Sequence, residues 1–273
     1  MTVTPLARAA GRIAGLSIGQ MLWSRRTLFM VMVTGVPIAI GGWARVLDTV
    51  GRFSVDVDNV RVAGPVLFGL MIWAFYIRFI VPVLGVFYGT ALIADEVDDR
   101  TITYLFTRPI PRAAVLLGKY AAYLVCTTMV VLPSVVVVYL LVAPIQGGLA
   151  GSFVALLVDL GILWAGLAVY GALFALVGSL VKRPLLVGLG FVLGWEPTVL
   201  LVPGYLRQFT LAHYLQGLVP HTMPQGDTLE FLRALFRTTP TVGMSLTVLA
   251  TVTVVSLALA MWTISHREYV VES

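Results

Sequence analysis

Charged residues and cysteine are scarce in this chain. Asp, Glu, Lys and Arg together make up 11% of the 273 residues, and only one cysteine is present. A lone Cys126 cannot form an intrachain disulfide, so the fold has no disulfide framework. Soluble domains hold about 25% charged residues. The low charge therefore excludes a soluble enzyme, and it equally excludes a charged, disordered chain.

Apolar residues are abundant instead, at 59% of the chain with a mean hydropathy of +0.96. A membrane-spanning helix needs about 20 mostly apolar residues. Six runs are of this kind: Thr27–Ala44, Gly64–Ala94, Tyr120–Ala143, Gly151–Leu180, Pro184–Pro203 and Gly243–Ser265. An outer-membrane barrel would show alternating segments of about 10 residues, which are absent. The sequence predicts an all-α polytopic membrane protein with six transmembrane helices in one domain, residues 1–273.

The positive charges indicate how the helices are oriented. With a cytoplasmic N-terminus, 11 Lys and Arg lie in cytoplasmic segments and 6 on the opposite side. Cytoplasmic loops are enriched in these residues, and short loops such as the Lys182–Arg183 turn are the most informative. We therefore expect a multi-pass protein of the plasma or inner membrane with both termini in the cytoplasm. This distribution also accounts for the net charge of +5 without a nucleic-acid partner.

The residues before the first span predict a separate helix over residues 4–24. Thr4 and Pro5 are a favourable helix start, because Thr caps the first turn and Pro fits its first position. Arg8 and Arg12 interrupt any apolar core of a signal peptide. Apolar residues recur at helical spacing, which favours a helix lying in the cytoplasmic membrane interface. The alternative is an ordinary extension of the first span.

Several enzyme signatures are incomplete. Gly15–Gly19 matches GxSxG, but this segment lies in a basic amphipathic helix and not in a strand–turn–helix. Gly118–Lys119 lacks the remaining residues of a P-loop. The three histidines, His213, His221 and His266, show no metalloprotease spacing, and none falls within a span. We therefore expect no catalytic residue, metal site or bound cofactor on this chain.

Glycine pairs four residues apart suggest close helix packing. Gly85 and Gly89 lie in the second span, and Gly190 and Gly194 in the fifth. Small residues at this spacing let neighbouring backbones approach each other. We predict a packing role for both pairs.

The segment after the second span, residues 94–112, combines acidic and apolar residues in a helical pattern. Four acids, Asp95, Glu96, Asp98 and Asp99, occupy its first turns, where they match the positive end of a helix dipole. An apolar stripe follows at Ile102, Leu105 and Phe106. Arg108 precedes Pro109, so the helix should end there. The pattern predicts an amphipathic rod of roughly 20 Å on the cytoplasmic surface.

At these residues the chain resembles the permease subunits of ABC-2-type (type V) ABC exporters. The matching positions are Ala94, Glu96, Asp98, Thr101, Leu105, Pro109, Arg112, Gly118 and Lys119. Arg100 stands where the family usually has Gly. The chain is most similar to short six-span permeases whose ATPase is a separate polypeptide, such as the permease of the nitrous oxide reductase maturation transporter.

The resemblance implies a transport subunit and not an enzyme. Its coupling helix, seated in a cytoplasmic ATPase, would comprise Asp95, Glu96, Asp98, Asp99, Arg100, Thr101, Ile102, Leu105, Phe106 and Arg108. Two copies of that ATPase would bind ATP and Mg. Further partners would be a second permease copy or homologue, membrane lipids, and an accessory periplasmic or extracellular protein. The alternative is a stand-alone secondary transporter or channel. The cargo is left open, and so is the choice between identical and different permeases.

Three charged residues lie within the predicted spans, where charge is costly and often functional. Arg78 and Asp159 fall near the outer ends of their spans, where they can reach water or pair with each other. Glu196 lies roughly 20 Å from Arg183, and Pro197 after it removes a backbone donor. We expect this pair to interrupt the fifth span, with Glu196 either capping the broken helix or forming part of a cargo gate.

The segment over residues 204–242 is the longest outside the predicted spans. Within it, Phe209–Val219 and Asp227–Arg237 show helical patterns. We expect short outer helices between spans five and six that lie on the membrane and cover the outer end of the pathway.

Overall fold

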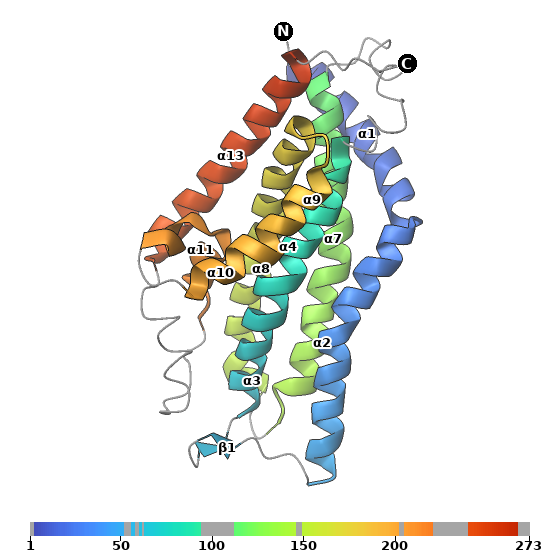
Figure 1. The fold of residues 1–273 in the computed structure, drawn as a ribbon. Helices are drawn as coiled ribbons and strands as arrows, with labels where there is room; N and C mark the ends of the chain where they lie inside the picture. Colours follow the sequence, from blue (N-terminus) through green and yellow to red (C-terminus); the bar gives the residue numbers. More distant parts are fainter. Residues whose placement is uncertain are drawn as a thin grey trace.

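The computed structural model is a bundle of long helices (Figure 1). It describes residues 3–51, 56–57, 60–61, 63–93, 112–145, 149–201, 205–220 and 240–266. Five helices are long and apolar enough to cross a membrane: Arg26–Thr49, Gly64–Ile93, Ala113–Val142, Gly151–Leu180 and Val242–His266. Pro184–Val199, within the fifth predicted span, is a shorter apolar helix. The helical membrane-protein class is thus confirmed.

Strand structure in the described part of the chain is limited to one small hairpin. Strands β1 (Asp56–Val57) and β2 (Val60–Arg61) pair in antiparallel register. The hairpin connects two long helices at the end of the bundle opposite to the start of α1 (Val3–Leu22) (Figure 1). At that end, Gly51 follows α2 (Arg25–Thr49) with a φ of +69°, a conformation that glycine adopts without a steric penalty.

Helices α1 and α2 form one bent rod. At the bend, the hydroxyls of Ser24 and Thr27 both donate hydrogen bonds to the carbonyl oxygen of Met21, at 2.8 and 2.5 Å. Side by side with this rod lies α7 (Arg112–Val142). The N-terminal helix is therefore present, and it packs along α7. Its path agrees with the alternative that α1 extends the first span. That α1 lies in the membrane interface stays a prediction.

The direction of α1 follows from two contacts with α7. A Cβ added at Gly118 would lie 2.7 Å from the carbonyl oxygen of Ala10. Eight residues further on, the Cys126 sulfur lies 4.0 Å from the carbonyl oxygen of Ile18. Since both helices advance together, α1 and α7 run in the same direction.

Span two, Gly64–Ile93, is one continuous helix with two π-helical segments. It comprises α3 (Gly64–Met71), η1 (Ile72–Ile80), α4 (Val81–Leu84) and η2 (Gly85–Gly89). A π-helical turn holds more residues than an α-helical turn, which changes the direction of the side chains, and such turns are frequent at functional sites. Segment η1 contains Arg78, one of the three predicted intramembrane charges.

Close glycine packing is confirmed for the second span, whereas the described residues place no neighbour beside the glycine pair of the fifth. Added Cβ atoms at Gly85 and Gly89 would lie 2.6 and 2.9 Å from the Cβ atoms of Tyr170 and Phe174 on α8 (Leu149–Leu180). Gly190 and Gly194 would meet nothing within 4 Å. Both lie on an exposed face, so no neighbouring helix of the chain needs the missing side chain.

Tyrosine hydroxyls join α7 to α8. Tyr120 and Tyr123 each donate a 2.8 Å hydrogen bond to a main-chain carbonyl of α8, at Ala168 and Leu167. These bonds satisfy buried hydroxyls that would otherwise be costly in an apolar interior. They fix two long helices side by side.

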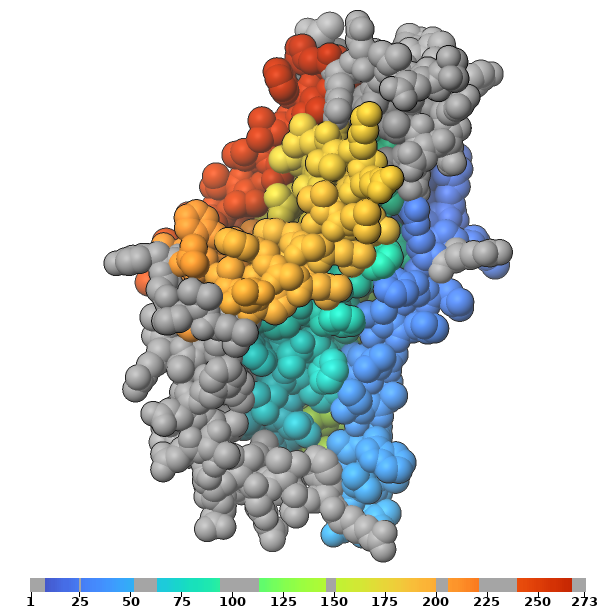
Figure 2. All heavy atoms as spheres, viewed as in Figure 1, coloured from blue at the N-terminus to red at the C-terminus, as the bar shows by residue number. Residues whose placement is uncertain are grey.

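The fifth predicted span is a rod lying across span two. The α9–α10 rod consists of α9 (Pro184–Leu189), η3 (Gly190–Trp195) and α10 (Glu196–Leu201), and Figure 2 shows it in yellow and orange over the teal of span two. Glu196 has helical φ and ψ of −60° and −45°, so the predicted interruption at Glu196–Pro197 is wrong. The π-helical turns of η3 directly before Pro197 accommodate a residue that lacks an N–H.

Two short helices and one long helix complete the described chain. They are η4 (Tyr205–Phe209), α11 (Leu211–Gln216) and α13 (Val242–His266). Helix α13 packs against α8, and α11 contacts η1, α8 and α13. The start of α1 and the end of α13 lie at the same end of the bundle (Figure 1).

Candidate functional site

The predicted coupling helix lies outside the described residues. This applies to Asp95, Glu96, Asp98, Asp99, Arg100, Thr101, Ile102, Leu105, Phe106 and Arg108, and to the predicted helix Asp227–Arg237. Their assigned roles stay predictions. The other predicted site residues, Arg78, Asp159, Glu196 and Pro197, are described.

Four polar side chains from four elements gather beside α11. They are Arg78 of η1, Tyr170 of α8, Glu196 of α10 and Gln216 of α11, here called the α11 cluster. Tyr170, Glu196 and Gln216 are buried, with exposed fractions of 0%, 2% and 4%. Residues far apart in sequence thus meet at one buried polar site.

Glu196 is the centre of the cluster. The Tyr170 hydroxyl donates a hydrogen bond to its Oε1 atom. The backbone N–H groups of Leu211 and Ala212, at the start of α11, interact favourably with the same carboxylate. Thr210, the N-cap residue of α11, makes no capping hydrogen bond through its own side chain. Glu196 therefore supplies the negative charge that a helix N-terminus attracts, and supplies it from a different helix.

Arg78 contacts the opposite end of α11. Its Nη2 atom donates a 3.0 Å hydrogen bond to Oε1 of Gln216, the last residue of that helix. The guanidinium also lies 5.5 Å from the ring centroid of Trp73, within the range of a cation–π interaction. Glu196 attracts the guanidinium, and Arg207 of η4 repels it. Arg78 is thus positioned by Trp73 of its own segment and by groups of η4, α10 and α11.

Asp159, which sequence reasoning placed as an alternative partner of Arg78, lies elsewhere. It is fully buried on α8, while Arg78 hydrogen-bonds to Gln216. The structure therefore brings Arg78 and Glu196 together in one cluster and leaves Asp159 outside it.

Several polar atoms of the α11 cluster have no hydrogen-bond partner among the residues that the structure describes. They are Nε and Nη1 of Arg78, Nε2 of Gln216 and Oε2 of Glu196. A buried donor or acceptor left unsatisfied costs about 1–3 kcal/mol. The cluster is consequently less stable than its hydrogen bonds alone suggest.

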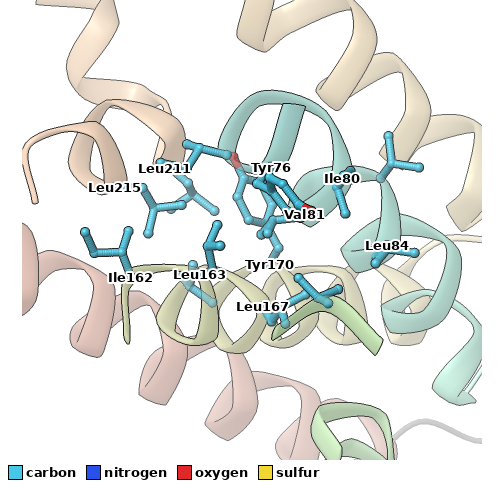
Figure 3. Close-up of a cluster of buried hydrophobic side chains, with 14 of the residues drawn as sticks. Tyr76, Ile80, Val81, Leu84, Ile162, Leu163, Leu167, Tyr170, Leu211 and Leu215 are labelled. Carbon is cyan, nitrogen blue, oxygen red and sulfur yellow. The ribbon is translucent and has the colours of Figure 1, made fainter. Parts of the chain in front are cut away.

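Apolar side chains surround the cluster. Figure 3 shows Tyr170 beside Tyr76 of η1, with Leu163 and Leu167 of α8 and Leu211 of α11 close by. All are buried. Electrostatic attraction and hydrogen bonding are stronger in such a low-dielectric environment than in water.

The α11 cluster positions helices relative to one another. In the part of the chain that the structure describes, no three His, Cys, Asp or Glu side chains gather in a way that could hold a metal ion. The cluster instead holds four elements together through hydrogen bonds and charge.

Sequence reasoning identified Arg78 and Glu196 and missed Tyr170 and Gln216. Charges in apolar runs are conspicuous, whereas a tyrosine in a span looks like an ordinary core residue. Gln216 was missed for another reason, because it belongs to a short helix outside the predicted spans. Only the three-dimensional structure pairs it with a residue 138 positions away.

Comparison with known protein families gives one match. The family described as "ABC-2 family transporter protein" matches residues 13–266, which include the cluster and all five long apolar helices. No curated protein matches the chain.

Proposed function

The chain belongs to the ABC-2 family of transporter proteins, and on this premise we propose that it is the membrane-spanning permease subunit of an ATP-driven exporter. The family match over residues 13–266 is the observation that supports this function most strongly. The bundle of long apolar helices agrees with it.

The proposal includes a separate ATPase. Two ATPase subunits would bind ATP and Mg in the cytoplasm, and the segment 94–112 would be the coupling helix that docks into them. The described part of span two reaches Ile93, which directly precedes this segment in the sequence, so docking would act close to span two. The likeness to short six-span permeases that use a separate ATPase belongs to this proposal.

The proposal also includes the orientation and the assembly. Both termini would be cytoplasmic, and the α9–α10 rod would be the fifth of six crossings, shorter than the others. The start of α1 and the end of α13 lie together, as an even number of crossings requires. The α11 cluster would then face the outer half of the membrane. Two permease copies or homologues would enclose the pathway, with Glu196 beside its outer end.

Copurification tests this function. The tagged full chain is isolated from its native membranes in a mild detergent, and the associated proteins are identified and assayed for ATP hydrolysis. We expect a P-loop ATPase in stoichiometric amount. Recovery of the chain without any ATPase, from membranes that are actively exporting, would contradict the proposal.

The second candidate is a stand-alone secondary transporter or channel. The observation in its favour is the attraction between the half-buried Arg78 and the buried Glu196, because intramembrane charges often mark ion or substrate pathways. Transport that continues after ATP depletion and follows an ion gradient would favour this candidate.

A further inference from the structure

Positive charge is in excess around α11. Arg207 of η4 repels Arg78 of η1, and both guanidinium groups act on the ring of His213. Their proximity follows from the packing, since η1 and η4 both contact α11. Glu196 attracts Arg78, but its carboxylate also interacts with Tyr170 and with the first amides of α11. Among the described side chains, two arginines thus meet one carboxylate at this place.

Hydrogen-bond donors are also in excess there. Three buried donor atoms of the α11 cluster, Nε and Nη1 of Arg78 and Nε2 of Gln216, have no partner among the described residues, against one such acceptor, Oε2 of Glu196. Buried donors are costly unless they are satisfied. Guanidinium and amide donors suit an oxyanion, because its oxygens accept several hydrogen bonds and its charge offsets the positive excess. The α11 cluster therefore has the chemistry of an anion-binding site.

Helix α13 indicates the depth of this place in a membrane. It has 25 residues, which span roughly 38 Å, slightly more than the hydrocarbon core of about 30 Å. Its first residues therefore lie near a membrane surface. Helix α11 ends beside them, because a Cβ added at Gly217, the residue after α11, would lie 2.9 Å from Cδ of Pro240. The α11 cluster is thus at the level of the lipid headgroups.

Polar and apolar side chains extend from this place to the surface. Arg207 and His213 are half-buried, while Leu206 and Phe209 of η4 are 43% and 71% exposed. Figure 2 shows the orange segment with η4 and α11 at the surface of the molecule. Exposed apolar side chains beside an arginine suit the membrane interface, where the apolar groups contact acyl chains and the guanidinium contacts headgroups. A soluble anion would gain nothing from these apolar neighbours.

We propose that a phospholipid binds here, with its phosphate at a headgroup site and its acyl chains along Leu206 and Phe209. The headgroup site comprises Arg78, Arg207, His213 and Gln216. The half-buried Arg207 contacts the phosphate through its planar guanidinium, which matches two phosphate oxygens. The phosphodiester carries a single negative charge, which matches the excess of two arginines over one carboxylate. This inference concerns lipid binding alone and depends on neither an ATPase nor transport.

Thermal unfolding of the delipidated full chain in detergent measures the binding, because a ligand of the folded state raises the midpoint. The probe is dioleoylphosphatidylglycerol. Dioleoylglycerol is the matched control, since it has the same acyl chains and no phosphate. Inorganic phosphate, compared with chloride at equal ionic strength, tests the phosphate without acyl chains. We expect the midpoint to rise with phosphatidylglycerol and to stay unchanged with both controls.

Substitutions at Arg207 test the site itself. Arg207→Gln removes the charge, and the apparent affinity for phosphatidylglycerol should fall roughly tenfold or more, as loss of one charge-assisted hydrogen bond implies. Arg207→Lys keeps the charge without the planar fork and should weaken binding less. The matched control is Arg183→Gln, which removes an exposed arginine at the other end of the α9–α10 rod. Its affinity should equal that of the parent.

Three results would overturn the proposal. Equal shifts with phosphatidylglycerol and dioleoylglycerol would mean that the acyl chains bind alone, and an equal shift with inorganic phosphate would make a free anion the ligand. Equal affinities of Arg207→Gln and Arg183→Gln would remove Arg207 from the site. If Arg207→Gln does not fold, Arg207→Lys decides: weaker binding than in Arg183→Gln supports the site, and unchanged binding contradicts it. Since the assay contains no ATPase, its failure would leave the proposed permease function intact.

Discussion

The hydroxyl of Tyr170 donates a hydrogen bond to the carboxylate of Glu196, which lies 26 residues further along the chain. This bond joins α8 to the α9–α10 rod, and the same carboxylate interacts with the first amides of α11. One buried acidic side chain thereby determines how three elements meet. Removing the Glu196 carboxylate, or removing its hydrogen-bond donor, should therefore weaken the contacts among all three elements.

Replacing Tyr170 by Phe should destabilise the protein by about 1–3 kcal/mol, because the ring packing is kept while a buried carboxylate loses its donor. The midpoint of thermal unfolding in detergent measures this. Tyr139→Phe is the control, since it removes a buried hydroxyl that forms a 3.1 Å hydrogen bond with the neutral Ser152 hydroxyl and not with a carboxylate. A smaller loss for Tyr170→Phe than for the control would show that the carboxylate does not depend on the bond.

Gly178→Ala should weaken the packing between α8 and the end of span two. An added Cβ would lie 2.6 Å from the carbonyl oxygen of Thr90, and a backbone atom cannot move aside as a flexible side chain can. Overpacking of this kind costs typically about 1–3 kcal/mol. Gly161→Ala on the same helix is the control, because nothing lies within 4 Å of its added Cβ. Equal thermal midpoints for the two variants would contradict this packing.

The sequence predicted the long helices well and the contacts between them poorly. Five of the six apolar runs form helices long enough to cross a membrane, while the run Pro184–Pro203 contains a shorter helix. Gly85 and Gly89 proved to be packing residues as expected. The same spacing at Gly190 and Gly194 has no neighbour among the described residues, because a glycine pair does not reveal whether a helix of the same chain faces it. Spacing alone cannot supply that information.

The α11 cluster shows a similar limit. Intramembrane charge made Arg78 and Glu196 conspicuous, but their partners depend on the path of the chain through residues 205–216. The expected interruption at Pro197 was wrong because the π-helical turns of η3 before it accommodate a residue that lacks an N–H, and the sequence does not show such turns.

Stability should fall in mildly acidic solution because of His213 on α11. Burial, together with the nearby positive charges of Arg207 and Arg78, lowers the pKa of His213 below its ordinary value of 6.5. The neutral ring is thus favoured in the folded state. Its contribution to stability is present above pH 6.5 and is lost as the pH falls from there through the lowered pKa.

Thermal midpoints between pH 8 and pH 5 test this, with His213→Gln as the reference. The midpoint of the parent should decline below pH 6.5 more steeply than that of the variant. Parallel curves would show that protonation of His213 has no effect on folding.

The orientation can be tested by labelling single cysteines in intact cells. In a Cys126→Ala background, we expect an impermeant thiol reagent to reach Thr228→Cys on the outside and to leave Asp99→Cys unlabelled in the cytoplasm. The excess of Lys and Arg in the segments assigned to the cytoplasm is the reason. Labelling at position 99 together with protection at 228 would reverse the orientation.

The coupling segment tests the central claim, that this chain works with a separate ATPase. The double substitution Leu105→Ala with Phe106→Ala removes the predicted apolar stripe, and burial of each such side chain is worth roughly 1.5–3 kcal/mol. The measurement is the amount of ATPase recovered with the tagged chain. The matched control, Leu157→Ala with Val158→Ala, truncates two exposed side chains of α8, which belongs to a different part of the sequence from the coupling segment. We predict that the coupling variant reaches the membrane at normal abundance but loses the ATPase, while the control retains it. Full recovery of the ATPase with the coupling variant, or an equal loss with both variants, would contradict the claim.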